Sequence, residues 1–80
     1  MLNVKVLGSG CANCHKVEEL AKQAVAQLGV EAQVELVSDV NEMLRYGVMS
    51  TPAIVINDKV VSTGRVPALS QITTLITSAL

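Results

Sequence analysis

Aromatic residues are almost absent from this chain: one of its 80 residues is Tyr46, and there is no phenylalanine or tryptophan. An excess of charge is lacking too, because six basic residues balance seven acidic ones, and no like-charge run is longer than Glu18-Glu19. Proteins that bind nucleic acids need basic patches, and those that bind single strands add aromatic rings for base stacking. We therefore expect no nucleic-acid partner.

Long hydrophobic runs are also lacking. The longest, Ala53-Ile54-Val55-Ile56, is far shorter than the roughly 20 residues that span a bilayer as a helix. The opening stretch MLNVKVL alternates, and it is too short and too polar for the hydrophobic region of a signal peptide. We therefore expect no membrane partner and a cytoplasmic location, where thiols are kept reduced.

What the chain does have is hydrophobic residues, which make up 50% of the sequence. A chain of this length is the size of one small domain. We expect a single, monomeric domain over residues 1–80, with a packed core and little stability to spare.

Hydrophobic periodicity predicts seven elements. The third strand is apolar on both faces, as expected of a buried central strand, and Asn57-Asp58 forms a two-residue hairpin turn after it. A helical crossover makes the first two strands parallel, whereas the last two are antiparallel. The result is an α/β domain with a four-stranded mixed sheet flanked by three helices. The predicted strands are 2–7, 31–37, 53–56 and 59–63, and the predicted helices run from the cysteine motif to 28, from 40 to just before Gly47, and from 69 to 79.

The helix ends carry recognisable signals. Gly29 and Gly47 are suited to end the first two helices, because glycine adopts the left-handed conformation that follows many helices. Asp39 and Glu42 have the spacing of a capping box at the start of the second helix. Pro67 suits the first turn of the last helix.

The chemically informative stretch is Cys11-Ala12-Asn13-Cys14-His15. Its cysteine spacing serves redox dithiols and soft-metal sites, and with the following histidine it is also the pattern of c-type haem attachment. Haem needs an enclosing apolar pocket that a sheet protein does not supply here, so we interpret His15 as a solvent-facing helix residue. A structural zinc site would need two more ligands, and we expect no metal cofactor. Soft-metal domains that bind Cu(I) or As(III) remain an alternative, but they end on a strand rather than a helix.

The order of elements, the two cysteines at the start of the first helix and Thr51-Pro52 before the third strand together resemble a known family. It is that of the small thioredoxin-like, glutaredoxin-sized proteins described as redox-active disulfide proteins. The stretches GSGCANC, STPAIVIND and VSTGRVP carry the resemblance, which covers essentially the whole chain. The resemblance implies the thioredoxin fold, βαβαββα. It also implies a thiol–disulfide oxidoreductase whose redox group is the Cys11–Cys14 disulfide itself, with no added cofactor.

The resemblance assigns roles that the chemistry explains. A thiolate is the nucleophile in disulfide exchange, and a helix N-terminus lowers the cysteine pKa from roughly 8.5 to about 7 or below. Cys11 is therefore the expected nucleophile and Cys14 the resolving residue. Pro52 matches the family's cis-proline, and the backbone of Thr51 is expected to pair with an extended substrate. Gly10 is expected to leave the attacking sulfur open to that substrate.

Neighbouring residues are expected to modulate this chemistry. Ordinary thioredoxins have Trp before the first cysteine and Gly-Pro between the pair, and glutaredoxins usually have Pro-Tyr; here the residues are Gly10 and Ala12-Asn13. Ala12, Asn13 and His15 are possible modulators, and Arg65 is a further candidate to border the site. The expected partners are protein disulfides and a dithiol reductase, with thioredoxin reductase and glutathione both open as donors. A redox-sensing adaptor is a further alternative.

Overall fold

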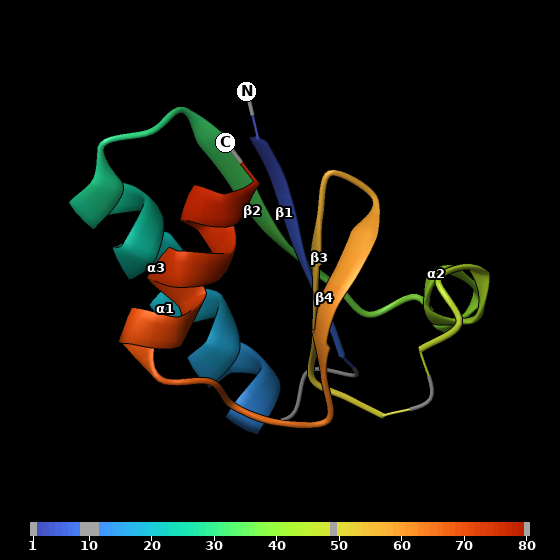
Figure 1. Ribbon diagram of the computed structural model, residues 1–80. Coiled ribbons are helices and arrows are strands. Elements are labelled where there is room, and N and C mark those ends of the chain that lie inside the picture. The colour runs from blue at the N-terminus through green and yellow to red at the C-terminus, as the bar shows by residue number, and fades with distance from the viewer. Residues whose placement is uncertain (1, 9–11, 49, 80) are drawn as a thin grey trace.

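The computed structural model describes residues 2–8, 12–48 and 50–79 (Figure 1). The order of elements is the predicted one, and their ends agree to within a residue. The elements are β1 (Leu2–Leu7), α1 (Ala12–Leu28), β2 (Ala32–Val37), α2 (Val40–Arg45), β3 (Ala53–Ile56), β4 (Lys59–Thr63) and α3 (Leu69–Ser78). A soft-metal domain of the kind considered above would end on a strand, so that architecture is wrong for this chain.

The four strands form one mixed sheet in the order β2-β1-β3-β4. β1 and β2 are parallel, whereas β3 is antiparallel to both β1 and β4, as predicted. The hairpin turn between β3 and β4 lies at Asn57 and Asp58, whose φ angles are 50° and 66°. Two successive positive φ angles give the turn a twist that matches the strands on either side.

Two layers of helix enclose the sheet. α1 and α3 pack together on one face, and α2 lies on the other (Figure 1). The alternation in β1 explains this division, because Val4 and Val6 face the α1–α3 layer while Leu7 belongs to the cluster under α2. β3 supplies both layers and is buried along its whole length, which confirms its prediction as a central strand.

Two predicted helix starts are wrong in detail. The carboxylate of Asp39 accepts a hydrogen bond from the Asn41 N–H at 2.9 Å, while the carboxylate of Glu42 contacts Arg45 instead of completing a capping box. Pro67 does not lie in the first turn of α3, because that helix begins two residues later. Its N-cap is Ala68, whose N–H donates to the side chain of Gln71 at 2.9 Å. The cap is thus provided from inside the helix.

Candidate active site

Cys14 lies in the first turn of α1 and is completely buried. It begins the helical stripe that continues through Val17, Ala21 and Ala24, all of which have 0% exposure. This spacing of three and four residues places the cysteine on the side of α1 that packs against the sheet. Cys14 is not a free thiol in this structure.

The backbone at Gly8 is packed against the Cys14 side chain. Gly8 follows β1, and its N–H donates to the carbonyl of Val37 at 3.0 Å. A Cβ placed on Gly8 would overlap the Sγ of Cys14 and lie only 2.9 Å from its Cβ. Glycine is therefore required here by the position of the sulfur. The sequence did not predict this contact between Gly8 and Cys14; its signal is a glycine directly after an apolar strand and just before the motif.

Several predicted site residues lie at the start of α1. Cys11 and Gly10 lie outside the described residues, so their roles stay predictions. Ala12 and Asn13 are exposed. His15 is exposed as well, and its Nδ1 lies 3.8 Å from the carboxylate of Glu18, one turn along the same helix. This is the solvent-facing position expected for His15.

The Thr51–Pro52 peptide bond is cis. Leu7 at the end of β1 lies opposite Ala53 at the start of β3, so Gly8 and Pro52 come to the same end of the sheet. Pro52 is buried and Thr51 is exposed. The Pro52 carbonyl accepts a hydrogen bond from the Gly64 N–H at 2.9 Å. The segment before β3 is thus fixed next to the segment after β4, at the end of the sheet where Cys14 is buried.

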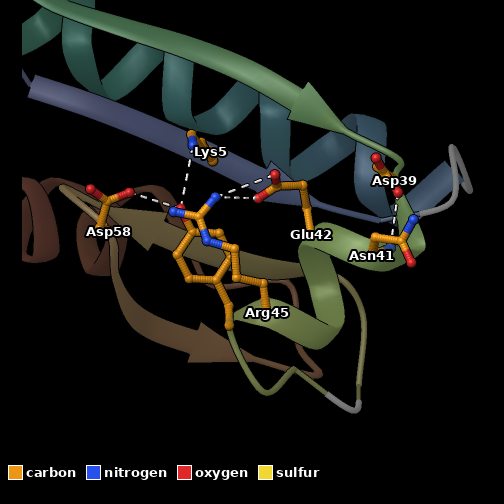
Figure 2. Close-up of polar contacts among 7 residues, drawn as sticks. Lys5, Asp39, Asn41, Glu42, Arg45 and Asp58 are labelled. Carbon is orange, nitrogen blue, oxygen red and sulfur yellow. Dashed lines mark hydrogen bonds and ion pairs between the residues drawn. The ribbon is translucent and has the colours of Figure 1, made fainter.

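Tyr46 tethers α2 to the sheet (Figure 2). Its hydroxyl donates to the Asp58 carboxylate at 2.8 Å and accepts from the Lys5 ammonium at 3.3 Å. The ammonium of Lys5 lies 5.7 Å from the centre of the ring, and the guanidinium of Arg45 lies 5.4 Å from it. Arg45 is itself held by Glu42 at 3.3 Å. Tyr46 comes shortly before Thr51-Pro52 in the chain. These contacts therefore also fix the start of the segment that leads to Thr51-Pro52.

Lys5 shows the electrostatic effect of this cluster. The pKa of its ammonium is raised above the ordinary value, first because it donates a hydrogen bond to Tyr46 and then because Tyr46, Asp58 and Glu42 favour the charged form, while burial acts in the opposite direction. A raised pKa in the folded state means that the contribution of Lys5 to stability is present below its unfolded pKa. That contribution is lost as the pH rises through the folded value.

Replacing Tyr46 with phenylalanine is expected to lower the free energy of unfolding at neutral pH by about 1 kcal/mol, the scale expected when a hydroxyl near the surface loses its two hydrogen bonds. Chemical denaturation measures this change. The Lys5 pKa, followed by NMR of its side chain, should move down toward the ordinary value because the hydrogen bond that raises it most is gone. An unchanged pKa would contradict the role given to the hydroxyl.

The described residues contain no group of three or more His, Cys, Asp or Glu side chains placed to hold a metal ion. None of their helices is long and apolar enough to cross a membrane.

The mixed sheet with α1 and α3 on one face and α2 on the other defines a protein of the thioredoxin-fold class. The germline-specific thioredoxin Deadhead from Drosophila melanogaster shares this fold: its crystal structure superposes with a TM-score of 0.69, covering 99% of this chain and 81% of that one at 20% identity. Sequence comparison gives the finer assignment. Residues 2–77 match the family model described as "Thioredoxin domain", and the chain belongs to this family.

Two curated relatives, both named thioredoxin, come from archaea. The protein of Methanocaldococcus jannaschii is 35% identical over 72 residues, which cover 90% of this chain and 83% of the relative. The protein of Methanothermobacter thermautotrophicus is 31% identical over 72 residues, covering 90% of this chain and 94% of the relative. Family and fold together support a thiol–disulfide oxidoreductase in general.

Proposed function

We propose that this protein reduces protein disulfides in the cytoplasm through the pair Cys11 and Cys14. The observation that carries the proposal is the place of Cys14, buried in the first turn of α1 against Gly8, at the end of the sheet where the Thr51–Pro52 segment lies. Cys11 directly precedes the first described residue of α1 in the sequence. Unpaired amide groups and the helix dipole favour an anion at such a position.

The burial of Cys14 distinguishes the two roles. A side chain with 0% exposure cannot meet the sulfur of a bulky protein disulfide directly. It can meet a sulfur already bound to the neighbouring cysteine, which is the task of a resolving thiol. Cys11 is therefore assigned the attack and Cys14 the resolution.

The reaction has two exchanges. The Cys11 thiolate attacks one sulfur of the substrate disulfide, which breaks the S–S bond, forms a mixed disulfide and releases the other sulfur as a thiolate that takes up a proton. The Cys14 thiol then loses its proton and attacks the Cys11 sulfur, which forms the Cys11–Cys14 disulfide and releases the second substrate thiol. Two electrons pass from the pair to the substrate, and the two released thiolates take up the Cys14 proton and one proton from water. A second dithiol, carried by a reductase, restores the pair by the same exchange in reverse.

The segment before β3 supplies the contact to substrate in this proposal. Thr51 is exposed while Pro52 is buried and bonded to Gly64, so the backbone of Thr51 is presented at the surface on a fixed support. An extended substrate chain pairs with such a backbone in the manner of an added strand.

Replacing Cys14 with serine is the experiment that tests the proposal. The variant should accumulate a mixed disulfide with a peptide or protein disulfide, because the second exchange has lost its thiol, whereas the wild-type protein should release both substrate thiols. Mass spectrometry of alkylated samples identifies the conjugate and the cysteine that carries it. A Cys14→Ser variant that stays unconjugated under conditions where the peptide disulfide is intact would sink the assignment. When the same Cys14→Ser variant is used to capture partner proteins, many trapped proteins would indicate a general reductant. A single trapped protein would indicate an adaptor.

A further inference from the structure

A groove lies beside the free edge of β4. The strand order leaves β4 paired on one side only, and a cavity of about 690 Å³ separates it from α3. The groove is lined by residues 60–63 of β4, by Arg65 and Pro67 of the connection, and by the α3 face that carries Ser70 and Gln71. Its volume is within the range of about 300–1,000 Å³ found for ligand pockets.

The lining of this groove carries one positive charge, together with hydroxyl and amide groups that can donate hydrogen bonds. Arg65 is the charged residue of the lining, it is exposed, and it forms no ion pair with any residue that the structure describes. The side-chain oxygen of Gln71 already accepts from the Ala68 N–H at 2.9 Å, which leaves its NH₂ group as the available donor. The Ser70 hydroxyl makes no hydrogen bond within the described part of the chain. A carboxylate is the group that complements a guanidinium surrounded by donors.

One end of the groove lies close to the Thr51–Pro52 segment. The residue between Thr63 and Arg65 is Gly64, whose N–H is bonded to the carbonyl of Pro52. A Cβ on Gly64 would lie 3.1 Å from the Cβ of Ser50, so the two segments are in close contact. The connection between β4 and α3, drawn in orange, runs along the bottom of the view in Figure 1. A polypeptide that meets the Thr51 backbone is therefore close to the Arg65 end of the groove.

The shape of β4 favours pairing of its free edge with a short peptide over edge-to-edge pairing with the sheet of a second copy of this chain. Ile54 lies opposite Ser62 but Val55 lies opposite Val60, so Val61 forms a bulge. A bulge together with a lysine at the strand start, here Lys59, opposes continuous edge-to-edge pairing. The part that remains for pairing is the end next to Arg65, which is long enough for a few residues only.

We propose that the groove between β4 and α3 binds an extended acidic segment of the disulfide substrate, with a substrate carboxylate paired to Arg65. The proposal rests on the proposed function, because it assigns the segment to the protein whose disulfide is reduced. It makes Arg65 a residue that selects substrates by charge.

The test compares two peptide disulfides that differ only near the cysteine, where one has Asp and Glu and the other has Asn and Gln. Wild-type protein should reduce the acidic peptide with a kcat/KM roughly fivefold higher, the scale of one partly exposed ion pair. Arg65→Gln should remove this preference and leave the neutral peptide unaffected. Lys59→Gln is the matched control, since Lys59 is an exposed cation at the start of β4 and lies outside the groove lining; it should keep the preference. Raised salt should reduce the preference in wild type.

A binding measurement separates this proposal from the proposed function. The acidic segment without cysteine is titrated into ¹⁵N-labelled protein, and we expect amide shifts at Ser62, Thr63 and Ser70 in wild type that Arg65→Gln abolishes. Amide shifts in the groove with no reduction of either peptide would support binding of the acidic segment there and contradict the proposed disulfide reduction. Equal reduction of both peptides by wild type, an equal loss on both in Arg65→Gln, or the absence of groove shifts would overturn the groove.

Discussion

Replacing Cys11 with serine is expected to reduce the rate of disulfide reduction at least about a thousandfold, to the level without protein. Losing an enzyme's nucleophile has effects of this size or larger. A serine hydroxyl does not ionise in the range where a cysteine thiol does, so the attacking anion is lost. Cys14 cannot take its place, because its side chain is completely buried against Gly8. The measurement is the rate at which the reduced protein opens a peptide disulfide.

The matched control for Cys11→Ser is Gln23→Ser. Gln23 is an exposed residue three turns further along α1, so its replacement with serine keeps the helix and should keep the rate. A Cys11→Ser variant that is as active as this control would contradict the proposed nucleophile. The two variants should also unfold at the same denaturant concentration when both are kept reduced, which excludes loss of the fold as the cause.

The pH dependence of alkylation tests the acidity of the same thiol. The thiolate is the reactive form, so the rate of reaction with iodoacetamide rises with pH through the pKa of Cys11. We expect the midpoint near or below about 7, compared with roughly 8.5 for an ordinary thiol. A midpoint at the ordinary value would contradict the proposal that the N-terminus of α1 lowers the pKa of Cys11.

The fold could be predicted from the sequence because each element carries its own local signal. β1 shows alternation, α1 shows spacings of three and four, and β3 is apolar throughout, so period and length separate strand from helix. The hairpin turn at Asn57-Asp58 is equally local, since both residues tolerate positive φ. The layer arrangement then follows, because a crossover helix between parallel strands has few places to pack.

The contacts that could not be predicted depend on residues far apart in the chain. Tyr46 meets Lys5 and Asp58, which lie 41 and 12 positions away, and no local pattern announces such a meeting. The predicted capping box at α2 was wrong for a similar reason: Glu42 had a competing partner in Arg45. The groove beside β4 likewise arises only after α3 is packed.

The candidate site was only partly visible from the sequence. The spacing of Cys11 and Cys14 predicts redox or soft-metal chemistry without separating the two, and the buried position of Cys14 follows from the helical stripe that begins with it. What spacing cannot show is the space that the sulfur needs. That space is created by Gly8, which follows β1 and meets Cys14 only in the folded chain.

Replacing Gly8 with alanine is expected to change both stability and redox behaviour. The added methyl group would occupy the position of the Cys14 sulfur, and forcing an extra group into a packed site costs about 1–3 kcal/mol of unfolding free energy. Because the sulfur must move, the equilibrium of the protein with a dithiothreitol redox buffer should shift as well. Gly29→Ala is the control: Gly29 has a φ of +65° and open space around it, so its replacement strains the backbone and lowers stability without touching Cys14.

A double-mutant cycle isolates the contact between Gly8 and the sulfur. In a Cys14→Ala background the Sγ is absent, so Gly8→Ala should cost much less than in the wild-type protein, with both series measured in the reduced state. Gly29→Ala should cost the same in either background, because nothing within 4 Å connects it to the site. An equal cost of Gly8→Ala in both backgrounds would mean that the backbone, and not the sulfur, requires glycine. A reduced cost would show that a glycine follows β1 because the Cys14 sulfur needs the space, which links the end of a strand to the thiol proposed to carry out the second exchange.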